Sequence, residues 1–167
     1  DCAVLPSQIF LYKKKFYLFY IGWTQGAKVP YMAALGLACS NSLNKKFKRI
    51  SLAPIIGRSN IDPIFTASCF VQKYKKHFKT FYTSNLKWSN INNVLVPKYI
   101  IKEGFSKNLL DWKYKKIAIN HKNKDEIALT RPWLLKDKNK KSVMIYSYGQ
   151  MKNKKNNYEI GMAYNKN

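Results

Sequence analysis

A threefold internal repeat constrains the fold of this chain more than any other feature of its sequence. Each copy begins with an X-Pro step and an apolar, strand-like run, followed by a lysine-rich turn. The three runs are VLPSQIFLY from Val4, IDPIFTASCFVQKY from Ile61 and LTRPWLLK from Leu129. A second apolar segment then ends on a tyrosine in every copy: Tyr20, Tyr82 and Tyr146. Because these tyrosines recur in register, we expect them to belong to the core.

The copies continue alike beyond the tyrosine. A third apolar segment carries a small residue near its end in each copy: Ala38, Gly104 and Ala163. In the first two copies an aromatic residue, Phe47 or Trp112, then opens a fourth segment. Four short antiparallel strands, repeated at intervals of 57 and 69 residues between Pro6, Pro63 and Pro132, are typical of propeller blades. A β-sandwich is the alternative, although it would not require the same motif order three times.

The predicted fold class is therefore all-β, a β-propeller of about two and a half to three four-stranded antiparallel blades. We expect one incomplete domain over residues 1–167, with blades at 4–52 and 61–119 and a partial blade at 129–167. The third copy ends before its fourth strand, and propellers close with about four to eight blades. The sequence therefore predicts an internal fragment of a longer protein.

Composition limits the class of partner. The chain has 167 residues, of which 46% are hydrophobic, enough for a packed core. No apolar run approaches the roughly 20 residues of a membrane-spanning helix, so no membrane span is expected. The net charge of +23 favours acidic partners, but only three of the 31 basic residues are arginine, the residue of bidentate phosphate and base recognition. We therefore expect no nucleic acid, and the charge reflects either A/T-rich codons or a surface for acidic glycans or phosphate-bearing substrates.

The three cysteines, Cys2, Cys39 and Cys69, lack metal-ligand spacing and are interpreted as free thiols. No zinc, nucleotide-binding or serine-hydrolase motif occurs in the sequence, so neither a metal nor a cofactor is expected. Free thiols favour a reducing, cytoplasmic location. The chain begins at Asp1 without a signal pattern, which leaves targeting undecided, and oligomeric state is also open.

Four segments carry a family resemblance: VLPS (4–7), FYIGWTQG (19–26), NIDPIFTAS (60–68) and DEIALTRPWLL (125–135). They resemble the five-bladed propeller glycosidases of glycoside hydrolase families 43, 32 and 130, and more narrowly a bacterial group of family-43-like proteins. The resemblance implies a carbohydrate-active enzyme that acts on a glycosidic bond of an oligo- or polysaccharide. Hydrolysis, phosphorolysis and transfer all stay open. A non-catalytic glycan-binding propeller is the alternative, and a basic nucleic-acid-binding domain is a third.

In these families the inner strands line a central funnel and carry acidic residues at their N-terminal ends. Glycoside cleavage needs two carboxyl groups that flank the scissile bond. Asp62 matches the Asp-Pro pattern of the families, which implies that it orients the substrate or stabilises the transition state. Glu126 is the predicted general acid, although the glutamate of the families lies nearer the proline. Asp1, at the start of the first inner strand, is a third acidic candidate.

Two arginines and two tryptophans complete the predicted site. Aligned on the prolines, the copies place Arg131 at the mouth of an inner strand, where it would be a donor fork for a sugar hydroxyl, carboxylate or phosphate. A salt bridge to one of the predicted acids is the alternative. Arg58 could play the same part. Trp23 and Trp133 are expected to stack on the apolar C–H faces of sugar rings.

Overall fold

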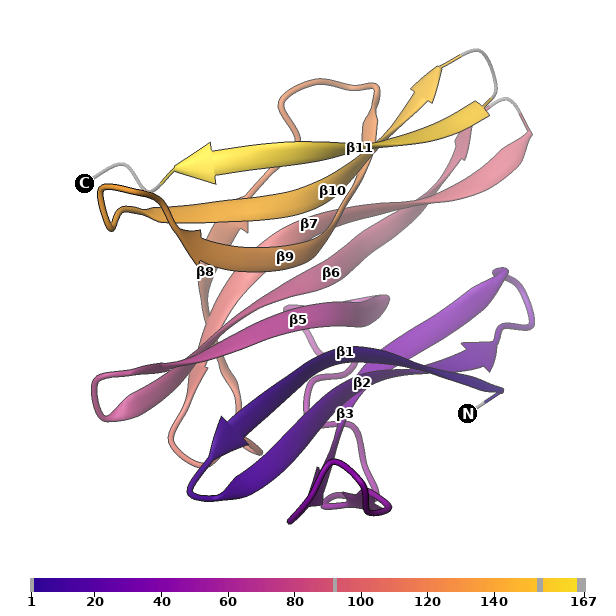
Figure 1. Cartoon of the computed structure of the whole chain (residues 1–167). Coiled ribbons are helices and arrows are strands. Elements are labelled where there is room, and N and C mark those ends of the chain that lie inside the picture. The colour runs from indigo at the N-terminus through magenta and orange to yellow at the C-terminus, as the bar shows by residue number, and fades with distance from the viewer. Residues whose placement is uncertain (1, 92, 153–154, 165–167) are drawn as a thin grey trace.

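The computed structural model describes residues 2–91, 93–152 and 155–164, and over these ranges the chain is all-β (Figure 1). No helix in the described ranges is long and apolar enough to cross a membrane. The first sheet is an antiparallel meander in the order β1-β2-β3-β4. Its strands are β1 (Ala3–Tyr12), β2 (Lys15–Gln25), β3 (Tyr31–Ser40) and β4 (Lys48–Arg49). We call this sheet the first blade.

The second sheet contains two further meanders, here called the second and third blades. The second blade comprises β5 (Phe65–Tyr74), β6 (His77–Ile91), β7 (Val94–Ser106) and β8 (Lys113–Ile119). The third comprises β9 (Glu126–Lys136), β10 (Ser142–Lys152) and β11 (Lys155–Tyr164). A single parallel pair, Tyr99 with Ala128, joins β7 to β9. The expected antiparallel order within each copy is therefore confirmed for the described strands.

The lysine-rich turns join the first two strands of each copy, as the sequence predicts; two of them are tight hairpins, and the third spans residues 137–141. Tyr12 pairs with Lys15, so the β1–β2 loop has two residues, and Lys13 and Lys14 have φ values of 49° and 61°. Two positive φ values are those of a type I′ turn, whose twist matches that of the flanking strands. The β5–β6 hairpin also closes over two residues, and Lys75 there has a φ of 52°. These lysines are exposed, where their charge discourages pairing between sheet edges.

The innermost strands β1, β5 and β9 lie side by side in the middle of the molecule (Figure 1). Side chains of β1 bond the backbone of β5: the Cys69 N–H donates to Ser7 Oγ over 2.7 Å, and the Ser7 hydroxyl donates to the Cys69 carbonyl over 2.9 Å. Gln8 exchanges a similar pair with Val71. Because these bonds join the strands through side chains, the first blade packs against the second without forming a continuous ladder with it.

Each innermost strand carries a β-bulge, at Ser7, at Ser68 and at Arg131–Pro132. These bulges, and not the X-Pro steps, mark equivalent positions. Pro63 precedes β5, whereas Pro132 lies inside β9, so the alignment of the copies on their prolines is wrong. Proline is tolerated wherever the strand needs no N–H donor, which is true both beside a bulge and before a strand begins.

The repeated tyrosines are buried, as expected. In the first and third blades the tyrosine lies opposite a glycine, Tyr20 opposite Gly36 and Tyr146 opposite Gly161. A Cβ atom on either glycine would overlap the tyrosine ring. In the second blade a lysine replaces that glycine.

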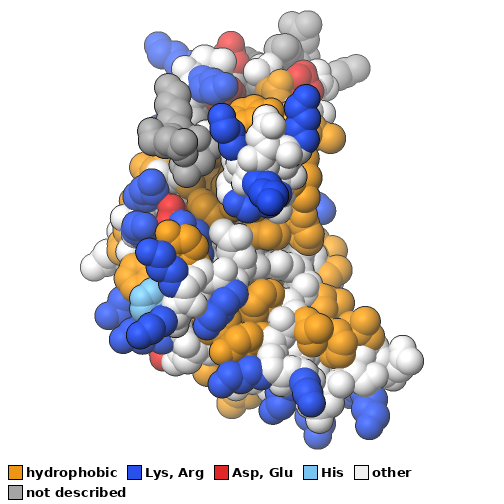
Figure 2. All heavy atoms as spheres, turned by 60° about the vertical axis from the view of Figure 1, so that its left-hand side comes forward, with side chains coloured by type: hydrophobic (Ala, Val, Ile, Leu, Met, Phe, Trp, Pro, Cys, Tyr) orange, Lys and Arg blue, Asp and Glu red, His pale blue; other side chains and the backbone are white. Residues whose placement is uncertain are grey.

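The surface is rich in lysine, as the net charge requires. Figure 2 shows Lys and Arg side chains in several groups, separated by hydrophobic and uncharged side chains. A groove of about 510 Å³ between the second and third blades is lined by five lysines and the buried Glu103. Lys79 and Lys115 hold that carboxylate at 3.1 Å and 3.3 Å. The acid of this groove is therefore already neutralised.

Candidate functional site

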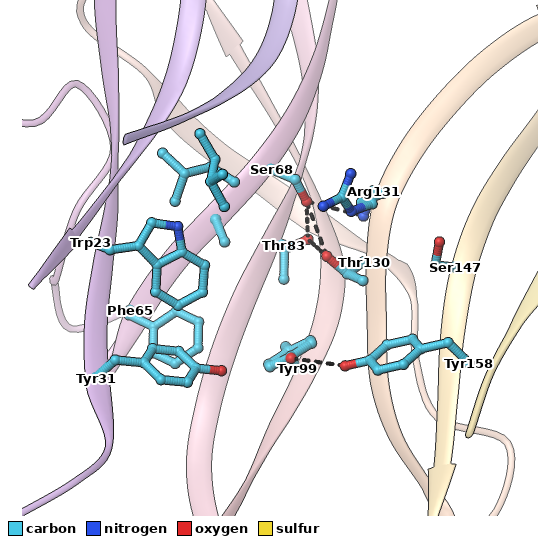
Figure 3. Close-up of a pocket in the computed structure, with 13 residues that line it drawn as sticks. Trp23, Tyr31, Phe65, Ser68, Thr83, Tyr99, Thr130, Arg131, Ser147 and Tyr158 are labelled. Atoms are coloured by element: carbon cyan, nitrogen blue, oxygen red, sulfur yellow. Dashed lines mark hydrogen bonds between the residues drawn. The ribbon is translucent and has the colours of Figure 1, made fainter. Parts of the chain in front are cut away.

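A pocket of about 400 Å³ opens where the three blades meet, beside the bulges of the innermost strands (Figure 3). We call it the inter-blade pocket. Every blade contributes to its lining: Trp23 and Tyr31 from the first blade, Phe65 and Tyr99 from the second, and Arg131 from the third. Clefts of this size that combine apolar walls with a few polar groups are typical ligand sites. It is therefore the candidate functional site.

Aromatic rings form one wall of the inter-blade pocket. The rings of Trp23 and Tyr31 meet at 4.5 Å between centroids with an interplanar angle of 65°, and Tyr31 contacts Phe65 at 5.4 Å. Across the pocket, the hydroxyl oxygens of Tyr99 and Tyr158 lie 3.3 Å apart (Figure 3). Burial raises the pKa of Tyr99 and of Tyr31, so both hydroxyls stay neutral at physiological pH.

A closed triangle of hydroxyls lies opposite the aromatic wall. Ser68 Oγ is 3.0 Å from both Thr83 Oγ1 and Thr130 Oγ1, and the two threonine oxygens are 3.1 Å apart. Each hydroxyl has one proton, so three protons satisfy three contacts. The second lone pair of Ser68 accepts the backbone N–H of Arg131 over 3.0 Å. In this arrangement all three protons lie within the triangle, and only the threonines keep a free lone pair.

Arg131 lies at the bulge of β9 with a φ of 51°. A non-glycine residue in this left-handed region is strained, and such strain is concentrated at functional sites. Its side chain is exposed and lines the inter-blade pocket. The described residues provide no ion pair for its guanidinium, so the salt bridge to Asp62 or Glu126 that the sequence left open is not formed within those ranges. Arg131 is the single charged residue in the described lining of this pocket.

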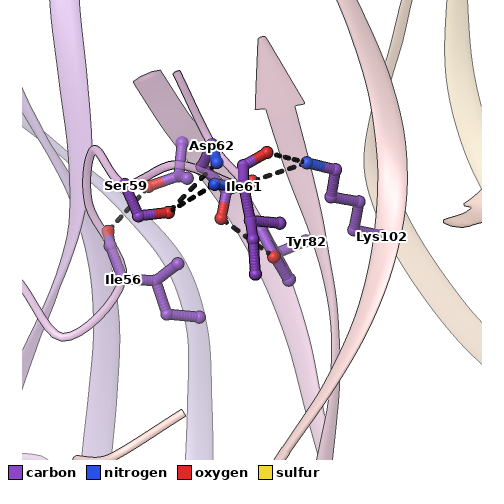
Figure 4. A network of polar contacts seen from close by, with 7 residues as sticks. Ile56, Ser59, Ile61, Asp62, Tyr82 and Lys102 are labelled. Carbon is purple, nitrogen blue, oxygen red and sulfur yellow. Dashed lines mark hydrogen bonds and ion pairs between the residues drawn. The ribbon is translucent and has the colours of Figure 1, made fainter. Parts of the chain in front are cut away.

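Asp62 lies apart from the inter-blade pocket, in a buried polar network just before β5 (Figure 4). Its Oδ1 lies 3.0 Å from Lys102 Nζ, and its Oδ2 accepts the Tyr82 hydroxyl over 3.1 Å. Lys102 Nζ also donates to the carbonyl of Ile61 over 2.5 Å. Lys102 is the residue that replaces the glycine found opposite the tyrosine in the other two blades. Both oxygens of Asp62 are therefore engaged.

Glu126 is buried at the first position of β9. Its Oε2 accepts the backbone N–H of Lys122 over 2.6 Å, which caps the loop before the strand. No described residue bonds its Oε1. Burial raises the pKa of Tyr146, and the charge of Glu126 adds to this rise. Asp62 and Glu126 lie six and five residues before the bulge residues Ser68 and Arg131, so Asp62 lies shortly before an innermost strand and Glu126 at the start of one. Asp1 lies outside the described residues.

The structure places some of the other predicted binding residues in the inter-blade pocket and others outside it. Trp23 lines the inter-blade pocket, and its indole N–H is buried without a partner among the described residues. Trp133 is half exposed and packs edge-on against Phe70, 5.0 Å between ring centroids, outside the pocket lining. The Nε–H of Arg58 donates to the Pro63 carbonyl over 3.1 Å and braces the turn before β5. The structure therefore brings Trp23 and Arg131 together in one pocket.

Sequence reasoning missed most of the polar lining. Ser68, Thr83 and Thr130 are ordinary strand residues in sequence, and only the tertiary packing of β5, β6 and β9 joins them. The bulge at Ser68 could not be predicted, because no proline or glycine marks its position in the sequence. No cluster of three or more His, Cys, Asp or Glu that could hold a metal ion occurs in the described part of the chain.

No protein-family model matches the chain. An uncharacterized protein of Mycobacterium tuberculosis is 25% identical over 138 residues, which cover 82% of this chain and 45% of the relative. The chain thus spans about half the length of the curated relatives it matches.

Solved structures of glycoside hydrolases are similar in fold. A family 32 β-fructofuranosidase mutant of Bombyx mori in complex with sucrose has a TM-score of 0.73 at 17% identity, over 93% of this chain and 32% of the enzyme. A thermostable family-43 glycoside hydrolase has a TM-score of 0.64 at 22% identity, over 95% and 49%. A family 117 glycoside hydrolase of Zobellia galactanivorans has a TM-score of 0.65 at 16% identity, over 95% and 51%.

These similarities confirm the predicted all-β propeller class and the resemblance to glycosidase-like propellers. They exclude the sandwich alternative, because the same three meanders superpose on propeller blades over nearly the whole chain. At identities this low they are evidence of fold alone. The chain therefore has the β-propeller fold of the glycoside hydrolases of families 32, 43 and 117.

Proposed function

We propose that this chain provides the sugar-binding part of a carbohydrate-active propeller protein, and that the sugar occupies the inter-blade pocket. The observation that carries the proposal is the pairing of an aromatic wall containing Trp23 with a polar edge formed by Thr130 and Arg131. A sugar ring has apolar C–H faces and hydroxyls at its rim. The pocket offers a matching surface for each, with rings on one side and hydrogen-bonding groups on the other.

Binding to an immobilised glycan array, followed by calorimetric titration of the strongest ligand, tests this proposal. Trp23→Phe should weaken binding at least tenfold, because it removes ring area and the indole N–H while keeping an aromatic side chain in the wall. Thr130→Val, which removes one hydroxyl at nearly constant volume, should also weaken it. Circular dichroism and thermal melts establish that the variants are folded. Unchanged affinity in both folded variants would contradict the proposal.

The same replacement at Trp133 tests the rival position that the sequence predicted. Because Trp133 packs against Phe70 outside the pocket lining, Trp133→Phe should bind as the unmodified protein does. A loss of affinity at Trp133 and not at Trp23 would move the sugar site to the outer side of β9.

We infer further that the whole protein acts on a glycosidic bond, with Glu126 as the acid. The supporting observation is the buried position of Glu126 at the start of β9 together with the unbonded Oε1. Asp62, with both oxygens engaged by Lys102 and Tyr82, suits an orienting role better than proton transfer. No acidic side chain belongs to the described lining of the inter-blade pocket, so a non-catalytic glycan-binding propeller is the alternative.

Reducing-end release from a polysaccharide panel separates these two functions. Glu126→Gln should lower turnover at least 100-fold, because general acid catalysis contributes about 10²–10⁴-fold, and should leave the affinity of the pocket ligand unchanged. Glu159→Gln is a matched control, since Glu159 is an exposed glutamate bonded to Tyr148. Binding without bond cleavage in the unmodified full-length protein would leave the glycan-binding module as the function.

A further inference from the structure

We propose that the inter-blade pocket selects sugars that carry an anionic group, and that Arg131 receives this group. This inference rests on the proposed sugar-binding function and names the class of ligand. The anion is a carboxylate, sulfate or phosphate, which share the oxygen geometry that a guanidinium fork binds.

The first argument for an anionic ligand is the charge of the pocket lining. Arg131 is the only charged side chain among the described lining residues, and none of them is acidic. An anion in this pocket therefore meets one positive charge and no neighbouring carboxylate. Of the predicted acids that the structure describes, Asp62 is paired with Lys102 and Glu126 does not line the pocket.

The second argument is the set of hydrogen-bond donors and acceptors in the pocket. In the triangle of Ser68, Thr83 and Thr130 every proton is used within the triangle. The triangle can accept protons from ligand hydroxyls, whereas donation to an anion would break one of its internal hydrogen bonds. Arg131 is the charged donor in the described lining, with five guanidinium N–H groups and no partner among the described residues. The Trp23 indole N–H, which also has no partner there, is a further, neutral donor.

The third argument is the fixed backbone conformation of Arg131. Its φ of 51° places it at a bulge, and its N–H is fixed by the Ser68 hydroxyl at 3.0 Å. Pro132 follows directly and restricts the chain further. The backbone of this strained residue is thus held in one conformation, so its side chain leaves the strand from a defined point. The fixed backbone lowers the freedom that is lost when a ligand arrives, while the exposed guanidinium is ordered by the ligand itself.

The ligand implied by these contacts is a sugar with an apolar ring face, free hydroxyls and one anionic group. One face of the sugar ring lies against Trp23 and Tyr31, its hydroxyls donate to the free lone pair of Thr130, and its anionic substituent meets Arg131. Neutral sugars would satisfy the first two contacts and leave the guanidinium solvated. We therefore expect uronate-, sulfate- or phosphate-bearing saccharides to bind more tightly than neutral ones of the same length.

A glycan array containing neutral, uronate-, sialate-, sulfate- and phosphate-bearing saccharides tests the inference on the unmodified protein. The expected result is preferential binding of anionic glycans, with the class of best ligand identifying the anion. For a uronate ligand, methyl esterification should weaken binding, because the ester keeps the sugar and removes the charge. Preferential binding of neutral glycans would overturn the inference while leaving the proposed function intact. Binding of no glycan at all would overturn both.

Arg131→Gln provides the residue-level test against the best anionic ligand. The expected loss is about 10- to 100-fold in affinity, the range for losing a hydrogen bond to a charged group. Arg131→Lys keeps the charge without the fork and should recover part of this loss. Affinity should fall with added sodium chloride in the unmodified protein and much less in Arg131→Gln.

The matched control is Arg49→Gln, which removes the same charge from an exposed position on β4 in the first blade, outside the inter-blade pocket. It should leave the affinity unchanged. Equal losses in Arg49→Gln and Arg131→Gln would show that the overall charge of the protein, and not the pocket, attracts the anion, which would overturn the inference.

Discussion

Replacing Lys102 with methionine should destabilise the protein by about 3–5 kcal/mol, because it leaves the buried Asp62 carboxylate without its cation. Lys102 and Asp62 are 3% and 4% exposed, and their charged atoms lie 3.0 Å apart. The ammonium group also bonds the carbonyl of Ile61, so the variant loses a second buried interaction. For a chain of this size about 2–4 °C of Tm accompany each kcal/mol, which gives a fall of roughly 6–20 °C.

Urea unfolding followed by tryptophan fluorescence measures this loss, and a thermal melt measures the shift in Tm. Lys116→Met is the matched control, since Lys116 Nζ is 3.9 Å from Glu103 and its side chain is 62% exposed. A long ion pair with an exposed ammonium group contributes about 1 kcal/mol or less. Equal effects of the two substitutions would refute the argument that burial makes the Asp62–Lys102 pair costly to break.

The double variant Asp62→Asn with Lys102→Met isolates the cause. It removes both charges, so it should recover most of the stability that Lys102→Met alone loses. The introduced asparagine can still accept the Tyr82 hydroxyl through its carbonyl oxygen. If the double variant is as unstable as Lys102→Met, then lost side-chain packing, and not an unpaired charge, explains the result.

Three further predictions concern packing and ionisation. Gln8→Ala should cost about 2–5 kcal/mol in urea unfolding, because two buried backbone groups of β5 lose their partners, whereas the exposed Gln25→Ala should change stability by less than about 0.5 kcal/mol. Gly36→Ala should cost about 1–3 kcal/mol, since a methyl group there overlaps the Tyr20 ring; an unchanged melt would show that the ring moves aside freely. Burial raises the pKa of the Cys69 thiol from 9.0 to about 12, so the unfolded thiol ionises first and stability falls as pH rises from 9 to 12. Cys69→Ala should show a shallower alkaline fall, and an identical pH profile would contradict this assignment.

The strand order within each copy could be predicted because it depends on local signals. Apolar runs of strand length, separated by short lysine turns and punctuated by a tyrosine, predict hairpins whichever sheet they later join. The lysine-rich turns are present as expected, and those at Lys13–Lys14 and Lys75–Lys76 have two residues each. The prolines misled the alignment because a proline reports only that an N–H is not needed at its position, and a strand offers several such positions.

Some residues of the candidate site could likewise be predicted from the sequence, and others could not. Trp23 and Arg131 could be selected because an indole beside a glycine-bearing loop and a rare arginine beside a proline are conspicuous in sequence. The buried pairing of Asp62 could not be predicted, because its cation, Lys102, is 40 residues away and appears in sequence as one lysine among many. The same is true of the hydroxyl triangle, which draws Ser68, Thr83 and Thr130 from three strands.

By itself the sequence determined that the chain folds as repeated antiparallel blades, because hairpin formation and the burial of apolar faces are dictated by residues close together along the chain. Only the tertiary structure decided which polar side chains meet. Blade packing brings residues about 60 positions apart into contact, as in the Ser7–Cys69 and Ser68–Thr130 pairs. A hydroxyl or a lysine has no individual signature in sequence, so its role is fixed only when a neighbouring blade supplies the partner or leaves it free to bind a ligand.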